Sequence, residues 1–439
     1  MERKGKKGKV LALALCGIAV LGIAGALLFR SGKDMNKEYI TQIDHALTSE
    51  DFLKADGKLL RNARGEQVQL RGTNIGGYLL REFWMSPVTK TLEVRDEITI
   101  YRMLEERFGT EKMYELVSAW RDGFFTEADF DNLDALGANC IRLPFWYRNL
   151  VDENGEFYEN AFARLDWFVE QAGKRGMYVI LDMHGAPGSQ NGKDISGVDG
   201  ESHQEETTYF FFGEDAPRYQ EQYLKIWTEV ASHFAGNPTV AGYDLLNEPF
   251  CEYRYTTSRS ANELHKLLWD VYDRAYDAIR AVDPDHLVIF EAVWDPSDLP
   301  DPKTMGWENI MYEYHNYNYG DYDNLTGEQI KSMQRKLALI RQANYDVPSY
   351  MGEFSYFDSL DAWDEGLKLL NEEGIHWTTW TYKTIYGTGN WGLYHHVSDL
   401  GKINFNRATE EEILAFCARL GECDPNEGLL EVVGKYMKE

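Results

Sequence analysis

The sequence predicts an α/β fold and, within that class, a closed (β/α)8 TIM barrel. Eight short apolar runs alternate with longer segments of helical period, and no linker or internal repeat interrupts the 439-residue chain after Lys37. Such alternation requires parallel strands joined by right-handed crossovers. Eight repeats in one continuous domain favour a closed barrel over an open doubly wound sheet. We therefore expect an N-terminal segment of residues 1–35 and a single barrel domain of residues 36–439.

The predicted strands are short runs rich in β-branched and aromatic residues. Three of them, which contain IRLPF, YVILDM and LVIF, are almost continuously apolar, as is typical of strands that are buried on both faces. In chain order the eight predicted strands are residues 68–74, 140–145, 178–184, 240–247, 287–292, 310–317, 349–354 and 376–382.

The predicted helices lie between these strands. Thr126 is placed to cap a helix over residues 126–137, with Asp129 three residues later and Gly137 as its end. The remaining predicted helices are residues 157–176, 217–234, 261–282, 327–343 and 360–373.

Residues 10–29 form an uncharged apolar stretch that follows the basic sequence MERKGKKGK. Twenty helical residues with a rise of about 1.5 Å each would cross a hydrocarbon core of roughly 30 Å. We favour an uncleaved signal anchor whose basic flank stays in the cytoplasm. A cleaved signal peptide is the main alternative, because Ala24-Gly25-Ala26 resembles a cleavage site, and a buried core helix is the third. Both export interpretations place the barrel at the extracellular face, either anchored or secreted.

Charge is unevenly distributed along the chain. The formal net charge is −27, whereas residues 1–35 alone carry +5, which leaves the rest of the chain at −32. A body this acidic would repel phosphate groups, so we expect no nucleic-acid partner and contact with membranes only through the N-terminal segment. The five cysteines include no CxxC pair and predict neither a disulfide scaffold nor a zinc ribbon.

Several predicted strands end in polar or aromatic residues, and the carboxyl ends of barrel strands meet at one rim. Each residue alone has an ordinary structural explanation, such as an exposed turn, a structural salt bridge or a core position. Their common placement at the ends of otherwise apolar strands indicates a functional site. In strand order the rim residues are Arg142, His184, Asn247, Glu248, His315, Tyr317, Glu353 and Trp380.

Two glutamates in such a group suit the hydrolysis of an acetal. One carboxylic acid must protonate the departing oxygen, while the other carboxylate attacks the sugar carbon or activates a water molecule. A carboxyl separation of roughly 5–5.5 Å accompanies retention of configuration, and one of about 6.5–9.5 Å accompanies inversion. The residues alone therefore predict a glycosidase without fixing its stereochemistry.

Seven motifs in chain order resemble glycoside hydrolase family 5, the cellulase-like family: RGTNIGG, GANCIRLPF, VILDMHG, YDLLNEP, EYHNY, MGEF and WTTW. The resemblance extends from Phe52 to Tyr382, and the Asn-Glu-Pro and Gly-Glu-Phe pair is its most specific part. It implies that Glu248 is the general acid/base, that Glu353 is the nucleophile and that the reaction retains the anomeric configuration.

The resemblance also implies roles for the other rim residues. Asn247 would bond the 2-hydroxyl of the sugar before the scissile bond, and Arg142 and Tyr317 would hold the Glu353 carboxylate. Two histidines would bind sugar hydroxyls or orient the acid/base, and one tryptophan would form a sugar platform: His184, His315 and Trp380.

Two loops are similar to the branch of this family that contains exo-acting β-1,3-glucanases and related β-glucosidases. They are HGAPGSQNG at residues 184–192 and the Asn74-Ile75-Gly76-Gly77 segment. Asn74 is therefore included among the predicted substrate-binding residues. Further aromatic residues could line sugar subsites, although packing would explain each of them, and Trp391 is the one included in the predicted site. The others are Trp84, residues 209–212, Trp294, Tyr319, Tyr386 and Tyr394.

The predicted function is that of a retaining β-glycosidase acting on β-glucans or gluco-oligosaccharides, with a neutral β-linked saccharide as its partner and a monomer as its form. An endo-β-1,4-glucanase, a β-mannanase or a non-catalytic carbohydrate-binding barrel are the alternatives. No cofactor or metal is expected. The GxGxxG at residues 387–392 lacks a βαβ unit, and GxSxG and HExxH are absent. The metal-like pairs Asp182-x-His184 and His395-His396 have no third ligand at fitting spacing.

Overall fold

The computed structural model describes residues 39–198, 208–250, 259–320 and 324–439. Ile40–Glu439 form one unit, to which the following description applies. The apolar segment predicted to act as an anchor or signal, residues 10–29, lies outside the described residues. Among the helices that are described, none is long and apolar enough to span a bilayer.

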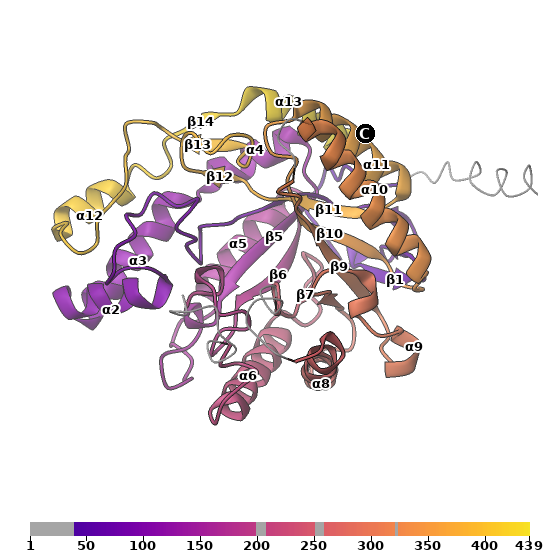
Figure 1. Cartoon of the computed structure of the whole chain (residues 1–439), viewed down its shortest axis with the longest axis horizontal. Helices are drawn as coiled ribbons and strands as arrows, with labels where there is room; N and C mark the ends of the chain where they lie inside the picture. Colours follow the sequence, from indigo (N-terminus) through magenta and orange to yellow (C-terminus); the bar gives the residue numbers. More distant parts are fainter. Residues whose placement is uncertain (1–38, 199–207, 251–258, 321–323) are drawn as a thin grey trace, which may run out of the picture. The chain divides into compact units, whose positions relative to one another are not determined.

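Eight parallel strands close into a barrel in the order β10-β11-β4-β5-β6-β7-β8-β9. Helices surround this barrel in Figure 1, which confirms the predicted fold class. The barrel strands are β4 (Arg71–Asn74), β5 (Cys140–Trp146), β6 (Tyr178–Gly185), β7 (Val240–Asp244), β8 (Leu287–Glu291), β9 (Ile310–Asn316), β10 (Ser349–Phe354) and β11 (His376–Thr379).

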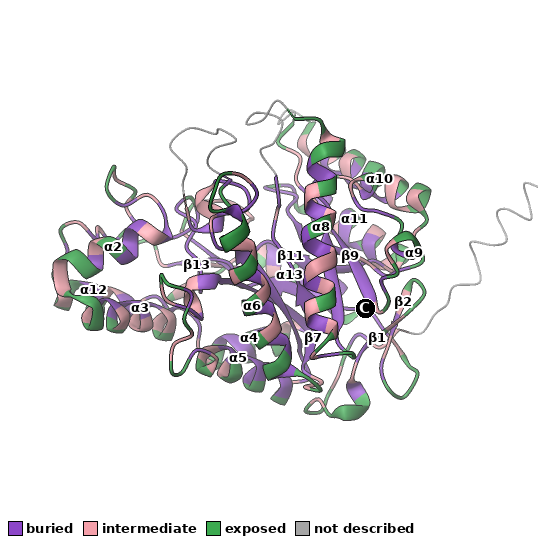
Figure 2. Ribbon diagram, turned by 90° about the horizontal axis from the view of Figure 1, so that it is seen from below, coloured by how far each residue is buried: buried purple, intermediate pink, exposed green. Residues whose placement is uncertain are grey.

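The helices around the barrel turn their buried faces inward and their exposed faces outward (Figure 2). The capping box predicted at Thr126 and Asp129 is present, and Gly137 ends that helix in a left-handed conformation. These helices are α4 (Glu127–Leu136), α5 (Ala163–Lys174), α6 (Ala216–Phe234), α8 (Ala261–Arg280), α10 (Leu325–Ala343) and α11 (Leu360–Glu373).

Three predicted strands differ from the observed strands by three residues at one end, whereas the others agree to within one residue. The run at 68–74 is divided, because Gln67–Val68 pair in a small antiparallel sheet and the barrel strand begins at Arg71. The strand predicted over 240–247 ends at Asp244, so Asn247 and Glu248 lie in the loop that follows. The last barrel strand ends at Thr379, just before Trp380.

Several elements outside the barrel repeat were not predicted. A sheet of β1 (Lys54–Asp56), β2 (Leu59–Arg61) and β3 (Gln67–Val68) contributes Leu60 and Val68 to the core at the amino ends of the barrel strands, and Leu53, just before β1, joins them. The other elements that were not predicted are α2 (Glu97–Phe108), α3 (Thr110–Phe124), α9 (Pro302–Met305), β12 (Lys383–Thr384), β13 (Tyr394–His396), α12 (Glu410–Cys417), β14 (Cys423–Pro425) and α13 (Glu427–Lys438).

The barrel interior has an apolar lower layer and a charged upper layer. Successive strand residues point to opposite faces, so residues two apart share a face. The lower layer includes Cys140, Ile180, Ile289 and Met311, which belong to one buried apolar cluster. Two residues further along each of these strands is a fully buried charged residue: Arg142, Asp182, Glu291 and Glu313. The functional rim therefore rests on charged groups that water does not reach.

The close approach of α3 to the end of α12 depends on a glycine. Both helices lie at the same side of the barrel in Figure 1. A Cβ atom on Gly123 would lie 1.9 Å from the backbone oxygen of Cys417. Such a distance is far below van der Waals contact, so any larger residue would push the two helices apart.

We expect Gly123→Ala to lower the free energy of unfolding by about 1–3 kcal/mol, the range for overpacking. The direction of the change in the free energy of unfolding is informative, because glycine-to-alanine replacement in an unobstructed helix would stabilise the protein by up to about 1 kcal/mol. Urea unfolding followed by circular dichroism measures the effect. Gly421→Ala is the matched control, since its Cβ would lie 3.4 Å from the nearest atom, in ordinary contact. Equal effects of both variants would contradict this account.

Candidate active site

The charged layer is organised around the side chain of Arg142, which has no exposed surface. Its Nε donates to Asp244 at 2.8 Å, and its Nη1 donates to Oε1 of Glu353 at 2.8 Å. Carboxylate oxygens of Asp182 and Glu313 lie 3.2 and 3.3 Å from the same guanidinium group. Burial alone would lower the pKa of Arg142, but these carboxylates hold it well above its usual value. The arginine therefore stays charged and joins its own strand, β5, to four others.

Glu248 and Glu353 face each other across the barrel mouth. A carboxylate oxygen of one lies within 4.8 Å of a carboxylate oxygen of the other, and an imidazole nitrogen of His315 lies within the same distance of both. Oε2 of Glu353 accepts a hydrogen bond from the Tyr317 hydroxyl at 2.9 Å. Oε1 of Glu248 lies 3.0 Å from Nδ1 of His315. The two carboxyl groups therefore have different partners, as two different chemical roles require.

The backbone at Glu248 has a left-handed conformation, with φ of 42°. This conformation is unfavourable for a residue with a side chain, and it persists only where the surroundings fix it. The N–H group of Glu248 donates to Oε2 of Glu291 at 2.7 Å. Glu291 is fully buried on β8, so this bond fixes the turn that directs the Glu248 carboxyl into the mouth.

Burial shifts the titration of the groups beneath the pair. It lowers the pKa of His315 to about 3, so this imidazole is neutral at pH 7. It raises the pKa of Glu291 and of Glu313 well above the ordinary range, and the neighbouring charge of Glu248 adds to the effect on Glu291. Both carboxyl groups therefore lose their protons less readily than carboxyl groups in water.

His184 forms a second buried ion pair at the end of β6. Its Nδ1 lies 2.7 Å from Asp182, and its Nε2 lies 3.5 Å from Glu82. Burial alone would lower the pKa of His184, but the Asp182 charge and the bonds to both carboxylates raise it to about 10. The ring also stacks on Trp380, with 5.4 Å between ring centroids. Trp380 is consequently only 3% exposed.

Asn247 and Asn74 both bond Arg142. Oδ1 of Asn247 accepts from Nη2 at 3.0 Å, and Oδ1 of Asn74 accepts from Nη1 at 3.1 Å. The side chain of Asn74 is fully buried, and its amide also donates to the Gly352 backbone oxygen at 2.8 Å. Asn74 therefore supports the arginine from beneath, although it was predicted on the side of the substrate.

An aromatic wall lies beside the Tyr317 hydroxyl. Trp391 packs against Tyr317, with ring centroids 5.6 Å apart, and against the edge of Trp84 at 4.8 Å. Nε1 of Trp84 donates to Glu82 at 2.7 Å. The loop after β4 and the segment after β11 therefore meet at this side of the mouth, where Trp84 remains 39% exposed.

Within the described part of the chain, two groups of side chains could present three ligand atoms to one cation. The first consists of Glu248, His315 and Glu353, and the second of Glu291, Glu313 and His315. His315 belongs to both groups, so the two sets could not be occupied independently. The first group lies at the mouth of the barrel, and the two glutamates of the second lie beneath it.

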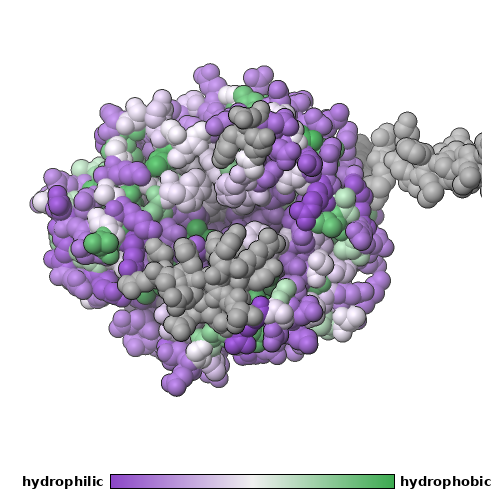
Figure 3. All heavy atoms as spheres, in the orientation of Figure 1, coloured by the Kyte–Doolittle hydropathy of each residue, from purple (hydrophilic) through white to green (hydrophobic). Residues whose placement is uncertain are grey.

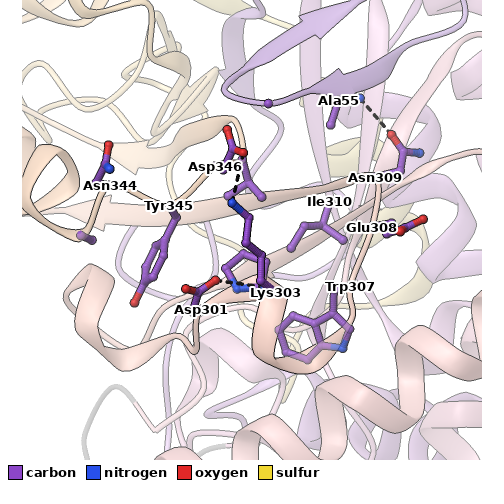
Figure 4. Close-up of a pocket in the computed structure, with 14 residues that line it drawn as sticks. Ala55, Asp301, Lys303, Trp307, Glu308, Asn309, Ile310, Asn344, Tyr345 and Asp346 are labelled. Atoms are coloured by element: carbon purple, nitrogen blue, oxygen red, sulfur yellow. Dashed lines mark hydrogen bonds and ion pairs between the residues drawn. The ribbon is translucent and has the colours of Figure 1, made fainter.

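The face of the molecule shown in Figure 3 is mostly hydrophilic where it is coloured, in keeping with the high content of acidic residues. A hollow of about 350 Å³ lies where β9 and β10 begin, and therefore at the end of the barrel opposite the rim. Figure 4 shows Lys303, Asp346 and Asn309 around it, with Lys303 Nζ 3.4 Å from the Asp346 carboxylate. No residue of the predicted site lines this hollow.

Comparison with protein families identifies the barrel. The family model described as cellulase, glycosyl hydrolase family 5, matches residues 105–384. The chain belongs to this family. Its members are O-glycosyl hydrolases, and this chain is one of them. The resemblance found in the sequence motifs is thereby confirmed.

Individual relatives are glycosidases of moderate similarity. A β-xylosidase from Phanerodontia chrysosporium is 27% identical across 78% of this chain and 72% of that protein. A glucan 1,3-β-glucosidase from Kluyveromyces lactis is 29% identical, and the match covers 57% of this chain and 58% of that enzyme. Among solved structures, an endogalactoceramidase shares the fold with a TM-score of 0.57 at 20% identity, covering 87% of this chain and 84% of that one.

Sequence reasoning missed five carboxyl groups of this family 5 site: Glu82, Asp182, Asp244, Glu291 and Glu313. Glu291 and Glu313 are inward-facing residues of β8 and β9, and Glu313 precedes His315 by two positions on the same face. The period of two could have identified both, because each interrupts an apolar strand. Glu82 lies in the irregular loop after β4, where no periodic signal was available.

The buried His184–Asp182 pair predicts a loss of stability at alkaline pH. A histidine whose folded pKa is raised stabilises the protein fully below its unfolded pKa of about 6.5, and the contribution disappears as pH rises to about 10. Between these values the free energy of unfolding should fall by up to about 1.4 kcal/mol per pH unit from this group. Denaturant unfolding at several pH values measures the slope, and His184→Gln should make it shallower. Parallel slopes for both proteins would refute this assignment.

Proposed function

We propose that this enzyme cleaves β-glucosidic bonds in β-glucans or gluco-oligosaccharides with retention of configuration. Glu353 acts as the nucleophile and Glu248 as the general acid/base. The observation that carries the proposal is the approach of the two carboxylates to within 4.8 Å. Such proximity suits direct attack by one carboxylate, because an inverting enzyme needs about 6.5–9.5 Å to admit a water molecule between them.

The partners of each glutamate support these roles. Arg142 and Tyr317 each bond one oxygen of Glu353 and so fix the orientation from which it attacks the anomeric carbon. Glu248 has a neutral histidine at its Oε1 and a side chain that is 18% exposed, so it can exchange a proton with the leaving oxygen and later with water. As C1 bonds to Glu353, the bond from C1 to the leaving oxygen breaks and that oxygen takes the proton of Glu248.

We assign the bound sugar ring to the side of the mouth that carries the aromatic wall. His184 and Asn247 supply polar groups there, and Trp380 forms part of the floor. Glu82 joins this group because its carboxylate lies beside His184 and Trp84. Neither Arg142 nor Asn74 has exposed side-chain surface. Arg142 therefore acts by orienting Glu353, and Asn74 acts by supporting Arg142.

The relatives favour a glucoside as the substrate. Glucan 1,3-β-glucosidases recur among them, although the K. lactis match covers little more than half of that protein. The P. chrysosporium β-xylosidase matches a larger share of this chain, so a β-xyloside is the second candidate. An endo-β-1,4-glucanase or β-mannanase activity is the further alternative. We also propose an extracellular location, which rests on the apolar segment of residues 10–29.

Replacement of the two glutamates should separate the steps of the reaction. Glu353→Gln should abolish turnover of every glycoside. Glu248→Gln should slow oligosaccharide hydrolysis by about 10²–10⁴-fold, the usual contribution of a general acid, but should spare the first step for an activated aryl glycoside. Single-turnover and steady-state assays measure this difference, and Glu372→Gln on the exposed face of α11 is the control. Full turnover by Glu353→Gln would refute the assignment.

Product stereochemistry provides an independent measurement. We expect proton NMR of the first-formed product to show the β-anomer, because two displacements at C1 restore the original configuration. An initial α-anomer would exclude the covalent route.

A panel of β-1,3-gluco-, cello-, manno- and xylo-oligosaccharides should show the highest kcat/KM for a gluco-oligosaccharide. EDTA should leave these rates unchanged, because the two glutamates perform both steps without a Lewis acid. A preference for mannosides or xylosides would replace the proposed substrate, and inhibition by EDTA that added metal reverses would require a metal in the reaction.

A further inference from the structure

We propose that Gln190, a buried residue of the loop after β6, is a positioning residue that holds the acid/base Glu248 in place through the backbone of the preceding residue. This inference rests on the proposed function, because it takes Glu248 as the group that donates and accepts the proton. It adds the part of the chain on which the turn at Glu248 is built, and it assigns a role to a side chain whose hydrogen bonds go to backbone groups.

Three successive backbone groups around Glu248 are bonded by side chains. The backbone oxygen of Asn247 accepts from Nε2 of Gln190 at 2.8 Å, and the N–H group of Glu248 donates to Glu291. The backbone oxygen of Glu248 accepts from Nδ2 of Asn191 at 3.4 Å. Two of these three anchors therefore come from consecutive residues of the neighbouring loop. The left-handed backbone of Glu248 needs such anchors, because it persists only where its surroundings fix it.

The carboxamide of Gln190 matches its surroundings with three hydrogen bonds. The side chain has no exposed surface. Its Nε2 donates to the backbone oxygens of His184 and Asn247, both at 2.8 Å, and its Oε1 accepts from the N–H group of Ala186 at 3.0 Å. An amide nitrogen has two hydrogens to donate, and both are used here. The opposite orientation would place an oxygen against two carbonyl oxygens, so Gln190 joins the end of β6 to the loop after β7 in one arrangement.

The loop that carries Gln190 is fixed by its own contacts. Ser189 has a left-handed backbone with φ of 62°, and its Oγ lies 2.6 Å from Oγ of Ser196. The backbone oxygen of Gln190 accepts from the N–H group of Phe250 at 3.3 Å, and the Phe250 ring stacks on Phe211 with 4.0 Å between centroids. The loop after β6 is therefore a support against which the loop after β7 packs on both sides of Glu248.

The contacts of Gln190 are separate from those that hold the nucleophile. Arg142 bonds Oε1 of Glu353 and Oδ1 of Asn247, so both side chains are held from beneath by the arginine. Loss of the two donors of Gln190 would free the peptide group that precedes Glu248, but it would leave these bonds in place. The expected effect is therefore on proton transfer by Glu248 and not on attack by Glu353.

The leaving group and the acceptor can separate these two events. Dinitrophenolate leaves 2,4-dinitrophenyl β-glucoside without a proton, because the electron pair of its bond to C1 is stabilised on the phenolate oxygen as Glu353 bonds to C1. A glucose disaccharide needs the proton of Glu248. In the second step water must lose a proton to Glu248, whereas azide attacks C1 directly. The bond from C1 to Glu353 then breaks, which yields β-glucosyl azide and a free carboxylate.

We expect Gln190→Leu to lower kcat/KM for a glucose disaccharide by about 10–100-fold, the order for a displacement of roughly 1 Å in a catalytic group. The kcat/KM for the dinitrophenyl glucoside should stay within about twofold of the unmodified enzyme, because its first step needs no general acid. Its kcat should fall with the loss of the general base, and added azide should restore it with β-glucosyl azide as the product. A merely structural role would not produce this dependence on leaving group and acceptor.

Two further variants keep the test decisive. Gln190→Glu preserves the size of the side chain, and a carboxyl group that faces two carbonyl oxygens there binds a proton and donates one bond. It should show the same pattern with a smaller loss, and it decides the outcome if Gln190→Leu does not fold. Gln69→Leu is the matched control, since Gln69 is also fully buried and its Nε2 donates to the backbone oxygen of Ile375 at 2.8 Å, at the opposite end of the barrel. It should leave the ratio of the two substrates unchanged.

An equal loss on both substrates, an unchanged rate on the disaccharide or a failure of azide to restore kcat would overturn the inference. The proposed function would remain intact in each case if Glu248→Gln itself showed the dependence on leaving group. Absence of that dependence in Glu248→Gln, or of any glycoside hydrolysis by the unmodified enzyme, would instead refute the proposed function and this inference with it.

Discussion

The structure depends on one charge that is removed from water. Arg142 has no exposed surface and reaches carboxylates on four other strands, including the proposed nucleophile. A buried guanidinium is tolerated only when its donors are satisfied, and loss of a partner leaves an uncompensated charge that costs several kcal/mol. The barrel therefore has to close with β5, β6, β7, β9 and β10 in one register. The geometry of the site is thereby a condition of folding.

The sequence predicted the barrel and its rim because both follow from local patterns. Apolar runs predicted the strands, and the residue types at their ends predicted the site, so Glu248 and Glu353 could be proposed as the reacting pair without coordinates. The charged layer beneath them was missed, since Asp182 and Glu313 are single residues inside apolar strands. Asp182 and Glu313 belong to the site because they contact Arg142, which lies on another strand. A short stretch of sequence does not reveal a contact between residues so far apart in the chain.

The elements that sequence reasoning missed are those whose partners are distant in the chain. The α2 and α3 helices interrupt the expected alternation after β4, and α3 is completed by its contact with the end of α12, almost three hundred residues later.

The bonds that Arg142 makes also have a chemical consequence. Arg142 and Tyr317 each donate a hydrogen bond to Glu353, so this carboxyl group is held in its charged form at the mouth. A retaining glycosidase passes through a transition state in which the sugar ring carries positive charge. A fixed carboxylate beside the ring stabilises such charge and would repel an anionic sugar. The arginine on which folding depends therefore also favours a neutral substrate whose charge appears only during the reaction.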